Sequence, residues 1–351
     1  MEIAIEAEGL RKRYGGHEAL RGVELSVPTG TLLGILGPNG AGKTTTVRVL
    51  ATLLDADGGR ARVAGYDVRE QPREVRRRIG LTGQYAALDE RLTGRENLRL
   101  IGTLHRLGRP AARARAGELL DRLGLADAAE RQVKTYSGGM RRRLDLAASL
   151  IGEPKVLFLD EPTTGLDLTS RLTLWDMIRE QLAAGVTVLM TTQYLEEADQ
   201  LADRVAVIDG GRVIADGTPD ELKAKVGGER LDVTLAEGGD TAGTVTALRT
   251  TGAEPVVAED GRLVSVPLGD GLRTVSEAAA ALASAGVRTA GFAVRRPSLD
   301  DVFLALTGST AESTGAAGAA DGAGVADGAG VAEAADVADG ADGPVPAGTE
   351  R

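Results

Sequence analysis

The stretch of sequence that decides the fold reads Gly37-Pro-Asn-Gly-Ala-Gly-Lys43-Thr44, and it lies between the segments TLLGIL at 31–36 and TTVRVLATLL at 45–54. It fits the pattern G-x-x-x-x-G-K-[ST] at every fixed position. The short apolar segment before it predicts a buried strand, and the period of the segment after it predicts a helix. Glycines let such a loop turn with its backbone N–H groups pointing inward, and the helix N-terminus adds its dipole. The sequence therefore predicts a loop that surrounds a phosphate group.

Two side chains of this loop have expected roles of their own. Lys43 is placed to reach the β- and γ-phosphates of a nucleoside triphosphate, and the Thr44 hydroxyl is placed to ligate Mg²⁺. A glycine-rich turn without a ligand is the alternative, and the strand and helix on either side argue against it. The residues expected to bind the nucleotide here are Gly37, Pro38, Asn39, Gly40, Ala41, Gly42, Lys43, Thr44 and Thr45.

A second strand with an acidic end is expected to complete the site. The apolar run at 156–159 ends in Asp160-Glu161-Pro162. At the carboxyl end of a strand, Asp160 would support Mg²⁺ directly or through water, and Glu161 is suited to orient the attacking water or to accept its proton. A strand that ends in Asp-Glu is by itself usually followed by a solvated turn. Beside a phosphate loop, we interpret the pair as a metal ligand and a catalytic residue.

The composition excludes several other kinds of site. The 351 residues, 42% of them hydrophobic, are enough for two compact domains. Because the chain has no cysteine and only His17 and His105, a disulfide scaffold, a thiolate zinc site, a catalytic cysteine and a histidine-rich metal centre are all excluded. The start MEIAIEAEGL does not resemble a secretory signal, and no uncharged stretch predicts a membrane-spanning helix. We therefore expect a soluble cytoplasmic chain.

The charge is unevenly distributed along the chain. The net charge is −10, and the segment 309–351 contributes −7 of it through eight acidic residues and one arginine. The rest of the chain is close to neutral, so we expect no overall attraction to nucleic acid. Runs of arginine at 106–115 and 141–143 are interpreted as solvated helical faces, with lipid head groups as the alternative partner.

The character of the sequence changes twice. Over 1–226, short apolar runs alternate with longer periodic segments, which predicts an α/β domain with a mixed or parallel sheet covered by helices. A Gly-Gly pair at 227–228 marks the expected boundary. Over 229–308 the pattern predicts a small α+β domain in the order βαββαβ, which is the ferredoxin-like arrangement. The segment 309–351, rich in alanine, glycine and aspartate, buries too little apolar surface to fold, so we predict that it is disordered.

The expected elements can be placed by residue number. In the first domain, buried strands are expected at 32–36, 156–159, 186–190 and 205–208. In the second, strands are expected at 231–235, 255–258, 263–267 and 287–294, and helices at 241–250 and 272–285. A last helix is expected to open at Ser298, with Asp301 three residues on as its capping-box partner.

With a third motif, the sequence resembles the ATP-binding subunits of ABC transporters. Tyr-Ser137-Gly138-Gly139-Met140 precedes the helical segment RRRLDLAASL, shortly before Asp160, and looks like the signature motif of that family. A serine and two glycines at a helix N-terminus present backbone donors to an anion. An ordinary helix N-cap is the alternative, and the spacing to the two other motifs favours the signature motif.

The resemblance covers residues 5–225 and implies roles for further residues. Tyr14, in RKRYGG, resembles the aromatic residue that stacks on adenine, with a surface or core tyrosine as a serious alternative. Gln84, in LTGQYAALD, resembles the glutamine that contacts Mg²⁺ and senses the γ-phosphate. Thr164-Gly165-Leu166-Asp167 resembles the loop that faces the partner subunit, with a solvated turn as the alternative.

Two positions depart from the wider family. Met140 stands where the signature glutamine is usual, and we expect little effect because the preceding serine and glycines supply the donors. Gln193, in MTTQYLEEAD, stands where most members carry the switch histidine. An amide can still donate a hydrogen bond to the γ-phosphate, but it has no proton that titrates near neutrality. We therefore expect phosphate sensing in an altered form.

Two longer segments resemble one particular branch of this family. The segments 193–223 and 295–308, the second reading RRPSLDDVFLALTG, look like the drug-resistance branch that resembles daunorubicin exporters. In that branch glutamine at position 193 is ordinary. The branch implies efflux of a hydrophobic or amphipathic compound, such as a drug or antibiotic.

The resemblance as a whole implies an ATP hydrolase with ATP and Mg²⁺ as its ligands and a P-loop fold that includes a helical subdomain. Two copies would pair head to tail, with each ATP between the phosphate loop of one and residues 137–139 of the other. A separately encoded membrane permease would dock near Gln84 and 93–125, at the cytoplasmic face of the membrane. The alternatives are a soluble ABC-type ATPase that acts on ribosomes or DNA and a regulator without turnover. The single phosphate loop and Glu161 argue against them.

Overall fold

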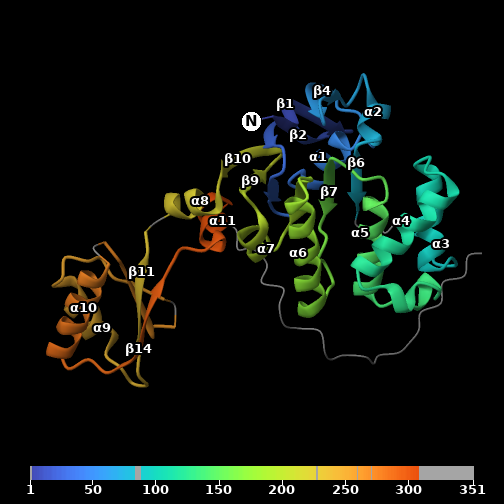
Figure 1. The fold of residues 1–351 in the computed structure, drawn as a ribbon. Helices are drawn as coiled ribbons and strands as arrows, with labels where there is room; N and C mark the ends of the chain where they lie inside the picture. The colour runs from blue at the N-terminus through green and yellow to red at the C-terminus, as the bar shows by residue number, and fades with distance from the viewer. Residues whose placement is uncertain (1, 84–87, 227, 259, 270, 308–351) are drawn as a thin grey trace, which may run out of the picture. The chain divides into compact units, whose positions relative to one another are not determined.

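A computed structural model describes residues 2–83, 88–226, 228–258, 260–269 and 271–307 (Figure 1). Its central feature is a sheet of six strands in the order β10-β9-β3-β8-β7-β6. The bounds are β3 Leu32–Leu36, β6 Ile79–Thr82, β7 Val156–Asp160, β8 Thr187–Thr192, β9 Arg204–Asp209 and β10 Arg212–Gly217. Neighbours from β9 to β6 pair in parallel, and β10 is antiparallel to β9. The mixed or parallel sheet expected from the sequence is confirmed.

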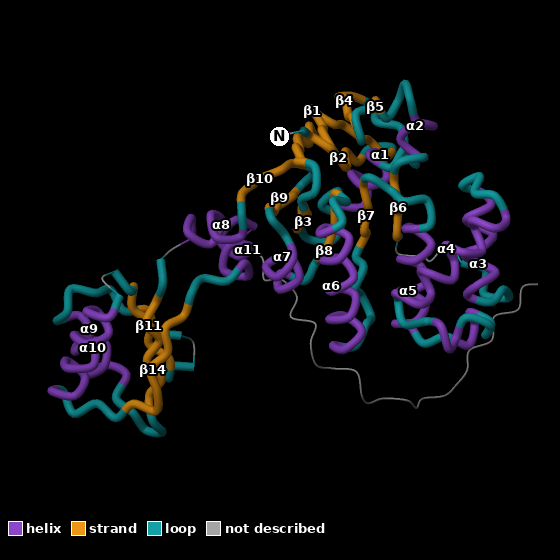
Figure 2. Tube along the Cα trace, in the orientation of Figure 1, coloured by secondary structure: helices purple, strands orange, loops and turns teal. Residues whose placement is uncertain are grey.

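The central strands are apolar because both faces of the sheet are covered. All residues of β3, β7 and β8 are buried. Since side chains alternate along a strand, Leu157 and Leu159 pack with helices on one face, while Val156 and Phe158 pack on the other. Figure 2 shows these strands side by side between helices. The covering helices are α1 (Lys43–Leu50), α5 (Gly138–Leu150) and α6 (Leu168–Ala183).

A second, antiparallel sheet in the order β2-β1-β4-β5 packs over the face that carries α1. Its strands are β1 Ile3–Tyr14, β2 His17–Pro28, β4 Gly58–Val63 and β5 Tyr66–Asp67, and the short helix α2 (Pro72–Arg76) follows. Ile5, Leu20 and Val63 of this sheet share an apolar cluster with Phe158 of the central sheet. The packing fixes the hairpin between β1 and β2 relative to the start of α1.

A helical subdomain lies between β6 and β7 in the chain. It comprises α3 (Gly94–Leu104), α4 (Arg109–Arg122), two short 3-10 turns at Ala126–Ala128 and Val133–Thr135, and α5. Thr93 and Glu96 form a complete capping box at the start of α3. Leu98, Leu120 and Leu144 bring the three helices into one buried cluster.

A smaller α+β unit follows α8 (Pro219–Val226). It is an antiparallel sheet in the order β12-β13-β11-β14, with one face covered by two helices. The elements are β11 Arg230–Leu235, α9 Thr241–Arg249, β12 Val256–Val257, β13 Leu263–Pro267, α10 Leu272–Ser284 and β14 Thr289–Arg295. This is the βαββαβ order that the sequence predicts. Its assignment to the ferredoxin-like class and the domain bounds 1–226 and 229–308 stay predictions.

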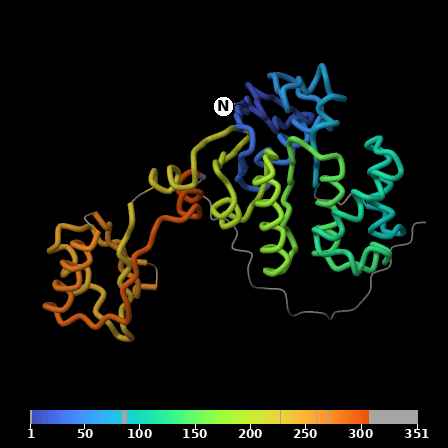
Figure 3. Tube along the Cα trace, in the orientation of Figure 1, coloured from blue at the N-terminus to red at the C-terminus, as the bar shows by residue number. Residues whose placement is uncertain are grey.

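The last helix, α11 (Leu299–Thr307), packs against the first domain. It begins with the expected capping box, because the Ser298 N–H donates to Asp301 Oδ2 (2.8 Å) and the Asp301 N–H donates to Ser298 Oγ (3.2 Å). Phe303 joins an apolar cluster with Leu222 of α8 and with side chains of α7. Helix α7 covers Leu195–Leu201. Figure 3 shows α11 beside α8, although the two are far apart in the sequence.

Some sequence-based expectations fall outside the described residues. They concern Gln84, the boundary residue Gly227 and the predicted disordered segment 309–351. Among the helices that the structure does describe, none has the length and apolar character needed to cross a membrane.

Candidate functional site

The predicted phosphate loop joins β3 to α1 at the edge where the parallel strands end. Two of its glycines are required by their surroundings. A Cβ at Gly37 would clash with the Ile208 carbonyl, and one at Gly42, whose φ is +111°, would lie 2.7 Å from the Ala19 carbonyl oxygen. Gly42 is also the N-cap of α1, and no side chain caps that helix end. The first N–H groups of α1 can therefore face a phosphate.

Lys43, the first residue of α1, is buried with its ammonium group against the loop. Its Nζ donates to the carbonyl oxygens of Gly37 (2.7 Å) and Pro38 (3.1 Å). Burial lowers the pKa of Lys43, while the negative charges of Glu161 and Asp160 raise it. A cation held at the mouth of a glycine-rich loop suits the negative charge of a polyphosphate.

Asp160 connects three elements at this edge of the sheet. Its Oδ1 accepts hydrogen bonds from Thr44 Oγ1 in α1 (3.2 Å) and from Thr191 Oγ1 in β8 (2.5 Å). A hydroxyl and a carboxylate are the hard oxygen ligands that Mg²⁺ takes together with water and substrate phosphates. In the part of the chain that the structure describes, no group of three or more acidic, histidine or cysteine ligands is found. An ion at Thr44 and Asp160 would therefore complete its coordination with the nucleotide and water.

Glu161 adopts a backbone conformation that is unusual for its residue type. Its φ is +49°, in the left-handed region, which costs a residue with a Cβ about 1–2 kcal/mol. Its N–H donates to the Thr191 carbonyl oxygen (3.0 Å) and lies 3.1 Å from Thr191 Oγ1. Strained residues of this kind gather at functional sites, where the surroundings hold them. The conformation fits a side chain whose direction matters for chemistry.

The three predicted signature residues lie at the start of α5. Ser137 Oγ accepts a hydrogen bond from the Met140 N–H (3.2 Å), so the serine is indeed the helix N-cap. A Cβ at Gly139 would meet the hydroxyl of Ser170 in α6, whereas one at Gly138 would meet nothing. Within the described residues, no hydrogen bond joins this helix end to the phosphate loop. The exposed donors can therefore serve another molecule.

Two further predicted residues lie at the surface. Tyr14 ends β1 with 46% of its area exposed, which rules out the core alternative, and Lys12 Nζ lies 5.9 Å from its ring centroid. Asp167 is the N-cap of α6, since it accepts hydrogen bonds from the Ser170 N–H (2.8 Å) and hydroxyl (2.9 Å). The hydrogen bond from the Ser170 N–H lowers the pKa of Asp167. The predicted roles of Tyr14 and Asp167 in binding adenine and a partner subunit stay predictions.

Gln193 directly follows β8 and so lies at the same sheet edge as Thr191 and Asp160. Its side chain is partly buried. Gln84 lies outside the described residues, so its predicted contact with Mg²⁺ stays a prediction.

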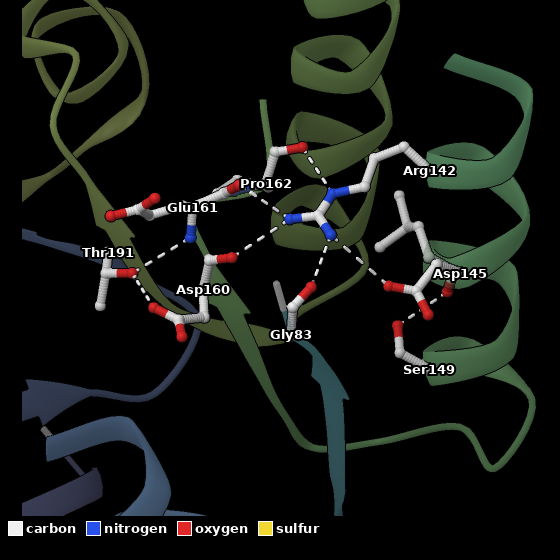
Figure 4. A network of polar contacts seen from close by, with 9 residues as sticks. Gly83, Arg142, Asp145, Ser149, Asp160, Glu161, Pro162 and Thr191 are labelled. Atoms are coloured by element: carbon white, nitrogen blue, oxygen red, sulfur yellow. Dashed lines mark hydrogen bonds and ion pairs between the residues drawn. The ribbon is translucent and has the colours of Figure 1, made fainter. Parts of the chain in front are cut away.

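Sequence reasoning missed two residues of the site. One is Thr191, whose only sequence signal is its place at the end of an apolar strand. The other is Arg142, for which the expected solvated face is wrong because its side chain is 13% exposed and donates to backbone carbonyls around Asp160 (Figure 4). The signal was Asp145, three residues on and on the same helical face, which supplies an opposite charge.

The parallel sheet, the glycine-rich loop between β3 and α1, and the acidic end of β7 define the class of P-loop nucleotide-binding proteins. Two family models match separate parts of the chain. One described as "ABC transporter" matches residues 20–164, and one described as the C-terminal domain of "ATP-binding protein DrrA1-3-like" matches residues 217–307.

Individual relatives are consistent with both family matches. The daunorubicin resistance ATP-binding protein DrrA3 of Streptomyces coeruleorubidus is 58% identical over 307 residues, which are 88% of this chain and 96% of that protein. The daunorubicin/doxorubicin resistance ATP-binding protein DrrA of Streptomyces peucetius is 52% identical over 91% of this chain and 96% of its own length. The chain belongs to the ABC transporter family, as one of its ATP-binding proteins, and is therefore an ATPase of the transport type.

A solved structure supports the fold. The dimeric bacterial ABC transporter cassette MJ0796 aligns with a TM-score of 0.57 and 25% sequence identity, over 61% of this chain and 98% of its own. The 61% of this chain that aligns is about the size of its first domain.

Proposed function

We propose that this chain is the ATP-hydrolysing subunit of an exporter that expels a hydrophobic drug or antibiotic through a separate membrane permease. The observation that carries the proposal is the 58% identity to a daunorubicin resistance protein along 88% of the chain, second domain included. A P-loop with its lysine, threonine and two acidic residues is also complete. A soluble ATPase without a transport partner is not favoured by these relatives.

Nucleotide binding is assigned to the phosphate loop and its neighbours. The loop N–H groups and the Lys43 ammonium would hold the β- and γ-phosphates, and Tyr14 would stack on adenine. Thr44 and Asp160, with Gln84, would hold Mg²⁺, which supplies positive charge to the phosphate oxygens when bound. The partly buried contact between the Thr44 hydroxyl and Asp160 supports this pairing.

Hydrolysis is assigned mainly to Glu161. Its carboxylate would orient the attacking water and accept its proton, while the Gln193 amide donates to the γ-phosphate. There is little covalent chemistry for the protein to perform in phosphoryl transfer, so positioning and charge stabilisation account for most of the rate.

The complete site would need two copies of the chain. Ser137, Gly138 and Gly139 of one copy would donate to the nucleotide bound at the phosphate loop of the other, and Asp167 would face the partner across the interface. The solved cassette that this chain resembles is described as dimeric, which supports the arrangement. The permease would dock near Gln84 and 93–125, so the dimer would work as a peripheral protein at the cytoplasmic face.

The test is ATP-driven transport by the purified chain reconstituted with a permease in lipid vesicles. The wild-type chain is expected to hydrolyse ATP and to move an anthracycline such as daunorubicin across the membrane. Glu161→Gln should still bind ATP but hydrolyse it at only a small residual rate and drive no transport, whereas Glu180→Gln, at an exposed position on α6, should behave as wild type. Unchanged hydrolysis by Glu161→Gln, or ATP turnover without transport, would contradict the proposal.

A further inference from the structure

Helix α5 carries three successive arginines, and their side chains go to three different places. Arg141 pairs with Glu90 at the surface (3.1 Å). Arg143 donates to the Leu123 carbonyl oxygen (3.1 Å) in the helical subdomain. Arg142, between them, turns toward the carboxyl end of β7 and is 13% exposed. A guanidinium that is largely withdrawn from water requires specific partners, because its charge would otherwise be left without compensation.

The partners of Arg142 are backbone carbonyl groups of the turn that holds the proposed catalytic carboxylate (Figure 4). Its Nε donates to the Pro162 oxygen (2.6 Å), and its Nη2 donates to the oxygens of Asp160 (3.1 Å) and Glu161 (2.8 Å). Its Nη1 donates to the Gly83 oxygen just beyond β6 (2.6 Å). One guanidinium thus binds the carbonyls of three consecutive residues at the end of β7 and one carbonyl that directly follows β6.

Only a guanidinium can make this set of contacts. Its donors are fixed in a plane and point in divergent directions, whereas lysine offers a single charged centre and glutamine a single amide. Asp145, one helical turn after Arg142, lies 3.7 Å from Nη1 and is itself buried. Burial lowers the pKa of Arg142 and the negative charge of Asp145 opposes that shift, so the carboxylate offsets part of the cost of burying the guanidinium.

The contact with Glu161 is the most informative of the four. Glu161 is held in the left-handed region at φ +49°. Its N–H donates to Thr191 on one side, and its carbonyl accepts from Arg142 on the other. Both polar backbone groups of the strained residue are therefore fixed, and the direction in which its Cα–Cβ bond points is fixed with them.

Arg142 also lies close in sequence to the proposed signature motif. Ser137, which caps α5, precedes it by little more than one helical turn. A rigid helix therefore connects the donors expected to contact one nucleotide with the carboxylate expected to act on the other.

We propose that Arg142 is a positioning residue that holds Glu161 in its catalytic direction and couples that direction to the signature end of α5. The inference rests on the proposed hydrolysis of ATP. It assigns to Arg142 an effect on the rate of hydrolysis and none on the binding of nucleotide, because its donors go to the turn and not to the phosphate loop.

The experiment compares Arg142→Gln, Arg142→Lys and the matched control Arg143→Gln in the full-length chain. The control also removes hydrogen bonds from α5 to backbone carbonyls, but to those of Leu123 and Gly124, away from the turn. We expect Arg142→Gln to lower kcat about tenfold or more and to change KM for Mg-ATP less than about twofold. Arg142→Lys should lie between Arg142→Gln and wild type, and Arg143→Gln should keep kcat within about twofold of wild type.

A double variant separates positioning from general damage. If Arg142 acts through Glu161, then adding Arg142→Gln to Glu161→Gln should not slow the residual turnover further, since the carboxylate to be positioned is already gone. Both Glu161→Gln and the double variant should bind ATP with the same affinity. Should Arg142→Gln not fold, as judged by its thermal midpoint, Arg142→Lys takes its place in the same comparisons.

Three results would overturn the inference. They are a normal kcat for both Arg142 variants, a loss of ATP affinity that parallels the loss of kcat, and an additive loss in the double variant. A wild-type chain that does not hydrolyse ATP would instead refute the proposed function, and with it the premise of this inference, so the two failures are distinguishable.

Discussion

At the scale of single residues, the buried charges of the site contribute little to the stability of the fold. Lys43 and Asp160 are both buried, and a buried charge disfavours the folded state unless it is paired. Their partners are the Gly37 and Pro38 carbonyls for the lysine and the Thr44 hydroxyl for the aspartate. These hydrogen bonds offset the free energy that each charge loses when it is removed from water, and they add little stability beyond that. Residues of the site are therefore expected to matter more for activity than for stability.

The substitution Lys43→Met tests this separation. Methionine is an unbranched side chain that fills similar space without a charge, so the free energy of unfolding is expected to change by less than about 1 kcal/mol. ATP hydrolysis should fall at least about a hundredfold, because the charge that faces the phosphates is removed. Thermal unfolding without nucleotide measures the first effect, and steady-state ATP hydrolysis measures the second. The nucleotide should raise the midpoint of the wild type and not that of the variant. A large loss of stability without nucleotide would contradict this view of Lys43.

Glu197 on α7 gives a pH-dependent prediction. The side chain is buried and its Oε1 accepts a hydrogen bond from Trp175 Nε1 (3.1 Å). Burial raises the pKa of Glu197. The folded chain therefore keeps the proton at pH values where the unfolded chain has lost it, so this group lowers stability as pH rises above the unfolded value of about 4.3. Glu197→Gln, which is neutral at all pH values, should stabilise the fold at pH 7 by on the order of 1 kcal/mol.

The control for this prediction is the neighbouring Glu196→Gln, at an exposed position. Thermal unfolding of both variants at pH 4, 7 and 8 would measure the difference. The gain of Glu197→Gln should shrink toward about pH 4, where the wild-type residue is protonated in both states. If Glu197→Gln stabilised the fold equally at all three pH values, burial of the Glu197 charge could not be the cause of the added stability.

At the scale of elements, the sequence predicts local structure well and tertiary partners poorly. The phosphate loop and the acidic end of β7 were predicted because each follows an apolar strand at a fixed spacing. In the second domain, α9 and α10 begin where expected and end within one residue of the expected position. Strand β12 is only Val256–Val257, shorter than expected, because only two of its residues pair with β13. The run at 141–143 shows the limit, since periodicity alone does not reveal that Arg142 donates to carbonyls at and just beyond the ends of β6 and β7.

Helix α11 gives a prediction at this scale. Its capping box marks its start in the sequence, but nothing there indicates that its apolar face packs on α7 and α8. Phe303 is 6% exposed in that cluster, whereas Leu304, the next residue, is 40% exposed. Phe303→Ala should lower the free energy of unfolding of the first domain by about 3 kcal/mol, and Leu304→Ala by less than about 1 kcal/mol. Denaturant unfolding measures both, and equal effects would contradict the packing of α11.

At the scale of the whole molecule, the phosphate loop and the proposed signature residues occupy separate places in one chain. The phosphate loop with Lys43 lies at the end of the parallel sheet, and the signature residues lie at the start of α5. No hydrogen bond within the described residues joins the two. If a second copy supplies the missing half, a defect in the loop and a defect in the signature motif belong to different composite sites.

Mixing two inactive chains tests this directly. In a dimer of one Lys43→Met chain and one Gly139→Asp chain, one composite site carries both defects and the other carries none. Neither variant alone should hydrolyse ATP, but an equal mixture that pairs at random should reach about a quarter of the wild-type rate, since half of its dimers hold one intact site. The control is a mixture of two chains that both carry Lys43→Met. It should stay inactive, because every composite site then carries the same defect. No gain on mixing would mean that each chain completes its own site, because only a shared interface lets two damaged copies restore one another.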